Sequence, residues 1–224
     1  MTPIRAVLFD WGDTLFESPH APTVIRDAAR EHGVPLDDGE ARRIWDELWA
    51  AGKTPEEHAK GRDLSRDAHQ RVWTELFSRA NERVPGIAPV LYQRVMDPAG
   101  WIPYPDTAPT LHALRERHVA VGIVSNHAYD LRPYFRAAGL DPFIDAYAIS
   151  YEVGAPKPDV RIFHEACTRL GSRPAETLMV GDDPSSDAGA GAAGLQVYVL
   201  PAHAAPGAAR GLDAIVALVD ASRR

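Results

Sequence analysis

The sequence predicts an α/β fold: a doubly wound parallel sheet with a helical domain inserted after its first strand. Two observations favour this fold. Short apolar runs rich in β-branched residues alternate with helical patterns in the second half of the chain, and a long stretch with helical spacing separates the first such run from the others. Strands that alternate with helices form a parallel sheet covered on both faces, and the ligands of such sheets bind at the C-terminal ends of the strands.

The composition is that of a globular protein with one core domain and room for a smaller one. The chain has 224 residues, of which 45% are hydrophobic and 25% charged. Its formal charge of -7, from 24 basic and 31 acidic residues, argues against a nucleic-acid or anionic-membrane partner, because such partners need clustered Lys and Arg and no basic run is present. An anionic substrate must therefore find its positive charge locally.

Cysteine content and hydropathy favour the cytoplasm. The single cysteine, Cys167, has no partner for an internal disulfide, and its helical position predicts that it packs in the core. The apolar run near the N-terminus, Ala6 to Phe9, is too short for a signal peptide or a transmembrane span. The sequence does not indicate an oligomeric state.

The first strand and the helical insertion come first along the chain. Ile4 to Phe9 is a compact apolar run that predicts a buried strand, with Asp10 at its C-terminal end. From about 21 to 96, apolar residues recur at helical spacing, which predicts about four helices. Their expected breaks are Gly33, Pro35, Gly52, Pro55 and Pro85. Residues 17–98 are thus expected to form an inserted cap domain, joined near 15–18 and 97–104 to a core of residues 1–16 and 99–224.

The remaining elements alternate. Asp106 or Thr107 is expected to cap a helix that runs to about His118. The strands that we then expect are Val119 to Val124, Ile144 to Ile149, Thr177 to Val180 and Gln196 to Leu200. Helical patterns near 128–138, 159–170 and 187–193 separate them, and the small-residue run from Ala202 to Ala209 is expected to be a surface loop.

Polar residues follow four of the predicted elements and form one constellation. They are Asp10, Ser125 with Asn126, Lys157 between two prolines, and Gly181-Asp182-Asp183 with Asp187. A carboxylate such as Asp10 is a competent nucleophile for a phosphoryl group when a divalent cation neutralises the phosphate oxygens, and Mg²⁺ prefers oxygen ligands. Asp10 and Asp182 are candidates to share that ion. The Ser125 hydroxyl, the Asn126 backbone N–H and the Lys157 ammonium are candidates to bind the phosphate.

This ordered set resembles the haloacid dehalogenase superfamily across essentially the whole chain, with its Rossmann-like core and a helical first-type cap. The resemblance implies that Asp10 is the nucleophile, that Ser125 and Lys157 bind phosphate, and that Asp182 holds Mg²⁺ with support from Asp183 or Asp187. Asp187 is followed by a small-residue helix, Ala188-Gly189-Ala190-Gly191-Ala192-Ala193-Gly194, which is also similar to the family pattern.

The first motif departs from the family. Its phosphatases usually carry a second Asp two residues after the nucleophile as general acid and base, and here that position is Gly12. Loss of a general acid or base typically costs about 10²- to 10⁴-fold in rate. We hypothesise that Gly12 supplies a flexible turn and Asp13 the proton, because Asp tolerates the left-handed conformation. His127 or a polar cap residue is an alternative, and the backbone carbonyl of Gly12 remains a candidate Mg²⁺ ligand.

Each of these residues also has an ordinary structural interpretation. Taken alone, Asp10, Asp183 and Asp187 would be helix-capping or first-turn acids, Ser125-Asn126 a turn, and Lys157 a solvated loop cation. Trp11 is a candidate to line the substrate space because it follows the nucleophile. Three other tryptophans are expected to belong mainly to the core of the cap: Trp45, Trp49 and Trp73.

The sequence thus predicts Mg²⁺-dependent hydrolysis of a small phosphorylated metabolite through an aspartyl-phosphate on Asp10. One alternative is a phosphate-binding or regulatory protein with weak or no turnover, consistent with Gly12. A second is a dehalogenase or phosphonate hydrolase, although dehalogenases of this type replace the acids that Gly181-Asp182-Asp183 retains, and the cap lysines Lys53 and Lys60 lack the context of a phosphonate-cleaving lysine. A receiver domain would be shorter and would lack the insertion.

Overall fold

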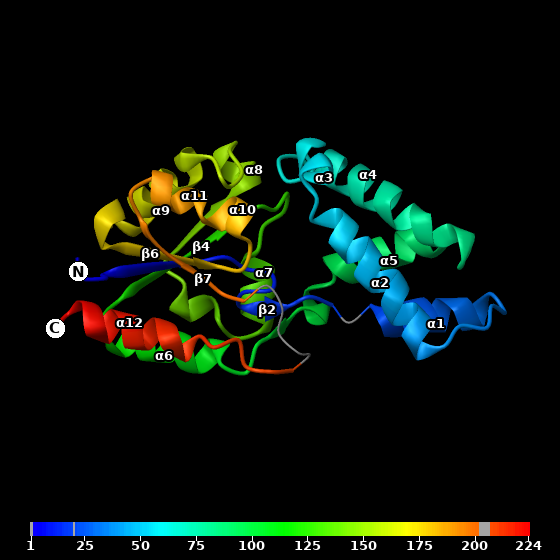
Figure 1. The fold of residues 1–224 in the computed structure, drawn as a ribbon, viewed down its shortest axis with the longest axis horizontal. Helices are drawn as coiled ribbons and strands as arrows, with labels where there is room; N and C mark the ends of the chain where they lie inside the picture. The colour runs from blue at the N-terminus through cyan, green and yellow to red at the C-terminus, as the bar shows by residue number, and fades with distance from the viewer. Residues whose placement is uncertain (1, 20, 202–206) are drawn as a thin grey trace. The chain divides into compact units, whose positions relative to one another are not determined.

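The computed structural model describes residues 2–19, 21–201 and 207–224 (Figure 1). Its contacts divide the chain into two compact units. One combines Met1–Glu17 with Ile102–Arg224, and the other is Ser18–Trp101. These borders differ by a few residues from the expected division at 16/17 and 98/99. The first unit contains the large sheet, and the second is helical.

The first unit is built on a five-stranded parallel sheet of order β5-β4-β1-β6-β7. The strands are β1 (Ala6–Phe9), β4 (Ala120–Ser125), β5 (Ala146–Ile149), β6 (Thr177–Gly181) and β7 (Gln196–Val199). The β1 register pairs Phe9 with Ile123 of β4 and with Val180 of β6. The predicted doubly wound parallel sheet is therefore confirmed, with its strands starting up to two residues later than expected.

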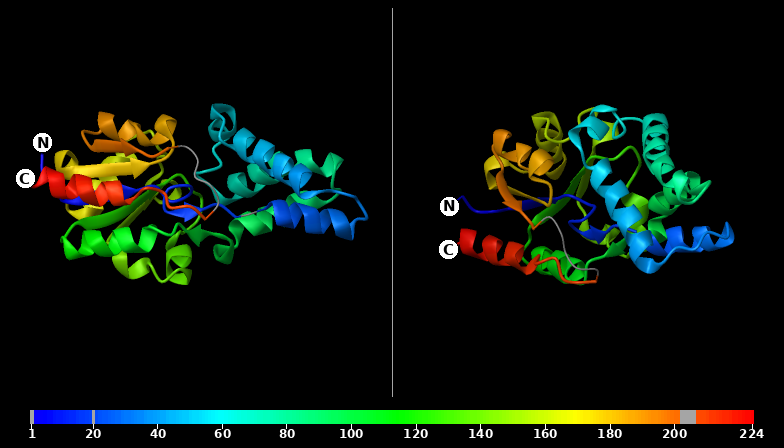
Figure 2. Two further views of the ribbon diagram at one scale, coloured as in Figure 1. Left: turned by 60° about the horizontal axis from the view of Figure 1, so that its bottom comes forward. Right: turned by 45° about the vertical axis from the view of Figure 1, so that its right-hand side comes forward.

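Helices cover both faces of this sheet, as Figures 1 and 2 show. On one face, α6 (Thr107–Glu116) packs beside α12 (Asp213–Ser222), and on the other α9 (Val160–Leu170) packs on β4 and β5. The shorter elements are α7 (Arg132–Ala137), α8 (Ser150–Val153), α10 (Pro184–Asp187), α11 (Gly189–Ala192), η3 (Asp141–Phe143) and η4 (Pro174–Glu176). Cys167 of α9 is buried in the core with Leu8, Val124, Phe163 and Met179, as predicted.

The expected helix at 187–193 is instead two short helices, α10 and α11. The chain is constrained at Gly189, where an added Cβ would lie 2.6 Å from the Pro158 carbonyl oxygen. Such an approach is open only to glycine. The break between α10 and α11 coincides with this close backbone contact, which the sequence pattern does not reveal.

Two very short strands lie where the chain leaves the first unit and returns to it. β2 (Phe16–Glu17) pairs antiparallel with β3 (Ile102–Pro103), with Phe16 opposite Pro103. This pairing brings the two connections together. Neither strand was expected, because two residues are too few to show an alternating pattern.

The second unit contains five α-helices in the described part of the chain, against about four expected. They are α1 (Pro22–Glu31), α2 (Asp38–Gly52), α3 (Pro55–Ala59), α4 (Arg66–Phe77) and α5 (Ile87–Met96), with η1 (Ser78–Glu82) and η2 (Pro98–Gly100). The additional helix is α3. Pro55 begins this helix behind the Thr54 cap instead of only breaking α2, because proline suits the first helical position.

Aromatic side chains form much of the core of this helical unit. Trp45 stacks on Trp49 with ring centroids 5.1 Å apart, and Trp49 stacks on Trp73 at 5.6 Å. Trp45 and Trp73 are buried and Trp49 is half-buried. The three tryptophans therefore pack as the helical spacing predicted. The described part of the chain contains no helix with the length and apolarity needed to cross a bilayer.

Asp106 is the N-cap residue of α6, as one of the two expected candidates, but its side chain does not cap the helix. Its carboxylate makes no cap bond in α6 and instead accepts hydrogen bonds from the backbone N–H groups of Arg210, Gly211 and Leu212, at 2.9, 2.7 and 2.8 Å. The competing partner comes from the far end of the chain, so local sequence could not reveal it. The Thr107 hydroxyl likewise donates to the Leu15 carbonyl at 2.7 Å. Of the expected loop at 202–209, residues 202–206 lie outside the described part of the structure.

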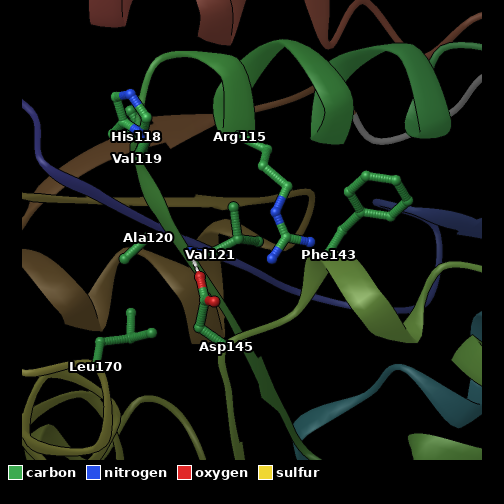
Figure 3. Close-up of a pocket in the computed structure, with 8 residues that line it drawn as sticks. All are labelled: Arg115, His118, Val119, Ala120, Val121, Phe143, Asp145 and Leu170. Atoms are coloured by element: carbon green, nitrogen blue, oxygen red, sulfur yellow. Dashed lines mark hydrogen bonds between the residues drawn. The ribbon is translucent and has the colours of Figure 1, made fainter.

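A cavity of about 420 Å³ lies at the N-terminal end of β4 (Figure 3). Its lining residues come from α6, β4, η3 and α9 and from the loops before β4 and β5, and include Arg115, His118, Phe143 and Asp145. Asp145 Oδ2 accepts a hydrogen bond from Val121 N at 2.8 Å. This cavity and the predicted site residues thus lie at opposite edges of the same sheet.

Candidate active site

The carboxyl edge of the sheet gathers the polar residues that the sequence predicted. Asp10 follows β1 and donates its backbone N–H to the Val180 carbonyl of β6 at 2.9 Å, so the β1–β6 pairing continues to it. Ser125 ends β4, on the other side of β1, and Asp182 follows β6. Because all these strands are parallel, their C-terminal ends meet at one edge.

Lys157 joins two of the carboxylates. Its Nζ lies 2.8 Å from Asp10 Oδ1 and 2.6 Å from Asp187 Oδ1, with the Lys157 side chain 2% exposed. Burial alone would lower the pKa of the ammonium, but the attraction of Asp10 and Asp187 outweighs it and raises the pKa. Lys157 is therefore a fixed positive charge in the site.

The protonation of the Asp10 carboxyl group depends on the charges around it. Burial raises the pKa of its carboxyl group to about 6; Lys157 opposes this rise and the nearby Asp187 adds to it. A carboxylate in this setting lacks sufficient positive charge around it. A bound cation would favour its ionised form.

Three carboxylates could hold such a cation. One oxygen from each of Asp10, Asp182 and Asp187 lies within 4.8 Å of the others. Mg²⁺ binds oxygen at about 2.1 Å, so ligands on opposite sides of it are about 4.2 Å apart, and the group fits after a small approach. The Thr14 hydroxyl donates to Asp182 Oδ1 at 3.2 Å and orients that carboxylate. A divalent cation suits this donor set.

Asp187 has a different environment from the other two acids. It is completely buried, Oδ1 accepts from Lys157 Nζ at 2.6 Å, and Oδ2 accepts from the Asp183 backbone N–H at 3.0 Å. An added Cβ on Gly181 would lie 2.0 Å from Asp187 Oδ2, so only glycine leaves room for this carboxylate. These contacts make Asp187 a residue that orients Lys157 and the loop after β6.

Asp183 caps α10 and stands outside the group of three carboxylates. Its Oδ1 accepts from Ser185 N at 2.9 Å and Ser185 Oγ at 2.6 Å, and its Oδ2 accepts from Ser186 Oγ at 3.0 Å. Burial would raise the pKa of this carboxyl group, but these hydrogen bonds outweigh it and lower the pKa. The structure thus gives Asp183 the helix-capping interpretation that the sequence also allowed.

Asn126 fixes the backbone of Lys157 through its side chain. Asn126 Nδ2 donates to the Lys157 carbonyl at 2.9 Å, and Asn126 Oδ1 accepts from Lys157 N at 2.6 Å. From the sequence, only the backbone N–H of Asn126 was expected to take part in the site. This paired contact spans two loops, so only the fold reveals it. Ser125, beside it, is buried at the end of β4.

Trp11 and His127 pack against each other. Trp11 is 3% exposed, and its ring lies edge-on to His127 at 5.3 Å and to Tyr134 at 4.8 Å and is tilted against Phe16 at 6.2 Å. Trp11 is thus packed among aromatic rings, and its contact with a substrate stays a prediction. His127 Nδ1 lies 3.1 Å from the Tyr129 backbone N–H, which donates to it.

The turn after Asp10 has its left-handed residue at Asp13. Asp13 has φ 56°, its N–H donates to the Phe16 carbonyl at 2.8 Å, and Leu15 N and Phe16 N donate to the Trp11 carbonyl. Gly12 forms an isolated bridge with Phe16. The left-handed conformation therefore falls on Asp13, which tolerates it, and not on Gly12. Asp13 itself is half-buried.

No sequence pattern indicated two residues that lie near Asp13. Arg210 Nε donates to the Asp13 carbonyl at 2.6 Å, and Arg210 lies over the Tyr104 ring at 5.8 Å. Burial raises the pKa of the Tyr104 phenol, the Asp13 charge adds to this rise, and Arg210 opposes it. Tyr104 and Arg210 are more than 100 residues apart in sequence, and no local pattern connects them.

Comparison with known proteins gives a consistent result. Residues 4–194 match the model of the haloacid dehalogenase-like hydrolases. The chain is 34% identical over 199 residues to a glyceraldehyde 3-phosphate phosphatase of Methanopyrus kandleri, covering 86% of this chain and 82% of that one. It is 30% identical over 203 residues to a ribulose-1,5-bisphosphate 5-phosphatase of Halopiger xanaduensis, covering 87% and 83%.

A solved structure extends the likeness to the fold. The phosphatase of this superfamily from Thermococcus onnurineus superposes with a TM-score of 0.63 and 25% identity, covering 99% of this chain and 100% of that one. The family match spans both units of the chain. The protein belongs to the haloacid dehalogenase-like hydrolases.

Proposed function

We propose that the protein is a Mg²⁺-dependent phosphatase of small phosphorylated metabolites, in which Asp10 is the nucleophile. The observation that carries the proposal is the cluster of Asp10, Asp182 and Asp187, in which Asp10 and Asp187 pair with the buried Lys157. The relatives named as phosphatases of small sugar phosphates support the substrate class. A buried group of three acids and one lysine is costly to fold, which favours a functional role over a structural one.

Asp10 attacks phosphorus, and the bond from phosphorus to the leaving oxygen breaks. The product of this step is an aspartyl-phosphate on Asp10, which water then cleaves at phosphorus. Lys157 Nζ lies 2.8 Å from the nucleophile and offsets the negative charge that gathers in the transferred group. The buried Ser125 hydroxyl and the Asn126 backbone N–H are proposed to bind the phosphoryl oxygens.

Asp10 and Asp182 are the proposed Mg²⁺ ligands, together with the Gly12 backbone carbonyl. Mg²⁺ would neutralise the phosphate oxygens and lower the cost of bringing a dianion to a carboxylate. Asp187 is proposed to support the site by orienting Lys157. Asp183 is left out of the ligand set because its carboxylate caps α10.

Asp13 is the proposed general acid and base. It gives a proton to the leaving alkoxide and later takes one from the attacking water. Its left-handed conformation and its place three residues after Asp10 motivate the assignment. Asp13→Asn is expected to lower kcat about 10²- to 10⁴-fold, the usual range for a general acid. Unchanged turnover in this variant would transfer the role to another group.

The helical unit Ser18–Trp101 is proposed to act as the cap that selects the substrate. Its two connections come together at the β2–β3 pair, which is a suitable place for a hinge. Solution scattering with and without Mg²⁺ and a phosphate mimic tests this, and identical profiles would count against closure. We still predict that the protein is cytoplasmic and that it binds neither nucleic acid nor membrane.

The direct test is hydrolysis of p-nitrophenyl phosphate at pH 5 to 8, with Mg²⁺ or with a chelator, in the wild type and in Asp10→Asn. We expect turnover that needs both the metal and Asp10. Asp145→Asn, a carboxylate at the other edge of the sheet, is the matched control and is expected to keep its activity. Equal turnover in Asp10→Asn and wild type would refute the proposed nucleophile.

Gly12 favours a second candidate, a phosphate-binding protein with little turnover. This reading predicts Mg²⁺-dependent binding of inorganic phosphate by calorimetry, and no release of p-nitrophenol in the same samples. Dehalogenation is less favoured, because the group of three carboxylates that suits a cation is retained. Release of chloride from 2-chloropropionate without metal would support it instead.

A further inference from the structure

We propose that Arg210 is a positioning residue for Asp13, which holds the turn after the nucleophile in its left-handed conformation and so aims the Asp13 carboxylate. This inference rests on the proposed function of Asp13. It adds a residue from the C-terminal segment, outside the family match of residues 4–194, to the machinery of the site.

Arg210 is buried in an unusual way. It is 5% exposed, and no carboxylate of the described residues forms an ion pair with it. Its Nη2 is also buried with no hydrogen-bond partner in the described part of the chain. A buried guanidinium without a counter-ion is costly, and proteins rarely keep one for packing alone. This cost indicates that the residue is retained for what it does at the turn.

The contact that Arg210 makes is directed at the one strained residue of the turn. Its Nε donates to the Asp13 carbonyl at 2.6 Å, and Asp13 has φ 56°. The left-handed conformation is unfavourable for a residue with a Cβ, so it needs contacts that hold it. A charge-assisted hydrogen bond to the carbonyl of that residue is such a contact.

Arg210 is itself held rigidly. Asp106 accepts hydrogen bonds from the backbone N–H groups of residues 210, 211 and 212, and Gly207 N donates to Glu17 Oε2 at 3.1 Å. The C-terminal segment is thus hydrogen-bonded both to Glu17 and to Asp106. Asp106, which the sequence suggested as a helix cap, anchors the backbone from which Arg210 reaches Asp13.

The Tyr104 ring lies beside the Arg210 guanidinium. The Arg210 guanidinium carbon lies 5.8 Å from the centre of the Tyr104 ring, and Tyr104 N donates to the Leu15 carbonyl at 3.0 Å. The ring is 6% exposed. The guanidinium therefore has an aromatic wall on one side and the Asp13 carbonyl as its partner, which fixes the direction of its Nε.

A double-mutant cycle tests the proposal with hydrolysis of p-nitrophenyl phosphate as the readout. Arg210→Met is expected to lower kcat about 10²-fold with KM unchanged, because misplacement of a catalytic group by about 1 Å costs that much. In an Asp13→Asn background, the same substitution is expected to change kcat no further. Arg210→Lys keeps the charge and is expected to recover part of kcat.

Arg117→Met is the matched control. Arg117 also joins α6 to the C-terminal segment, through two hydrogen bonds to Asp220 at 2.8 and 2.9 Å, but at the opposite edge of the sheet. It is expected to leave kcat unchanged in both backgrounds. Should Arg210→Met fail to fold, Asp106→Asn, which weakens the anchor of residues 210–212, takes its place in the cycle.

Equal losses from Arg210→Met in the wild-type and Asp13→Asn backgrounds would overturn the proposal, because they would mean that Arg210 does not act through Asp13. A crystal structure of Arg210→Met gives a readout independent of activity: Asp13 is expected to leave the left-handed region, and retention of φ near 56° would also overturn the inference. Absence of any wild-type turnover would instead count against the proposed function, while this structure would still decide the role of Arg210.

Discussion

The two edges of the central sheet carry similar kinds of charged residue but differ in how exposed these side chains are. At the carboxyl edge, the side chains of Lys157 and Asp187 are 2% and 0% exposed. At the amino edge, the side chain of Arg5 is 70% exposed and that of Arg117 is 31% exposed. These two arginines reach water and are each paired with a carboxylate, Arg5 with Glu176 and Arg117 with Asp220. The charges at the carboxyl edge are buried as a group in which acids outnumber the one lysine.

This difference separates structural from functional charge. Exposed ion pairs contribute roughly 0 to 1 kcal/mol and tolerate loss. Buried like charges raise the free energy of the folded state, and a site that keeps them gains something other than stability. Substitutions at the carboxyl edge should therefore change chemistry strongly, and those at the amino edge should change stability slightly.

The largest expected effect is on metal binding. Asp182→Ala removes one of the two proposed protein carboxylates on Mg²⁺, and we expect the Mg²⁺-dependent turnover to fall about 10³-fold or more. Asp183→Ala is the matched control, since it removes the neighbouring acid that caps α10 and should cost only about 1 kcal/mol of stability. Mg²⁺ titrations of activity compare the two. Equal losses would mean that the cap and the metal site have been assigned wrongly.

Lys157→Met should give the next largest effect. It leaves Asp10 and Asp187 without their cation, so we expect kcat to fall about 10²- to 10³-fold. The metal-free protein should lose about 3 to 5 kcal/mol of stability. Lys60→Met is the control, because Lys60 pairs with the buried Glu57 of the helical unit at 3.1 Å. Kinetics and thermal unfolding should show a loss of stability without a loss of kcat in that control.

Asn126→Ala should have a moderate effect. It removes two hydrogen bonds that fix the Lys157 backbone, and we expect a loss of roughly 10-fold in kcat through misplacement of the ammonium. Gln196→Ala is the control. It removes a comparable amide on the edge strand β7, which donates to the carbonyls of Thr2 and Ala175. If both variants lowered kcat alike, the Asn126 contact would have no special role in the site.

The pH dependence of stability gives a smaller effect. The Asp10 pKa is raised from 3.8 to about 6 on folding, so the folded metal-free protein binds more protons than the unfolded chain between these values. Its stability should therefore fall as pH rises from about 4 to 6 and stay lower above that range, by on the order of 1 to 3 kcal/mol. Asp10→Asn should remove this decline in chemical denaturation with a chelator present. A wild-type curve parallel to the variant would contradict it.

The smallest effect belongs to the amino edge. Arg117→Met breaks an exposed pair with Asp220, and we expect a change in stability within about 0.5 kcal/mol and unchanged turnover. Thermal unfolding and p-nitrophenyl phosphate kinetics measure both quantities. A large loss of activity here would break the comparison between the two edges.

Much of the sheet and of its polar edge could be predicted because the signals are local. Each strand is a short apolar run, and Asp10, Ser125 and Asp182 lie directly at the strand ends. The Asn126 clamp, the Asp106 anchor and the Arg210 contact join segments 31, 104 and 197 residues apart, so no local pattern encodes them. The interpretation of Asp183 and Trp11 likewise depended on burial and on hydrogen-bond partners that appear only in the fold.

The central claim, that Asp10 is the nucleophile beside a Mg²⁺ held by Asp10 and Asp182, is tested most directly by a crystal structure grown with Mg²⁺ and beryllium fluoride. We predict a beryllofluoride group bonded to an Asp10 carboxylate oxygen, next to an ion that contacts both aspartates. A beryllofluoride bonded to another residue, or an ion bound elsewhere with Asp10 unmodified, would contradict it.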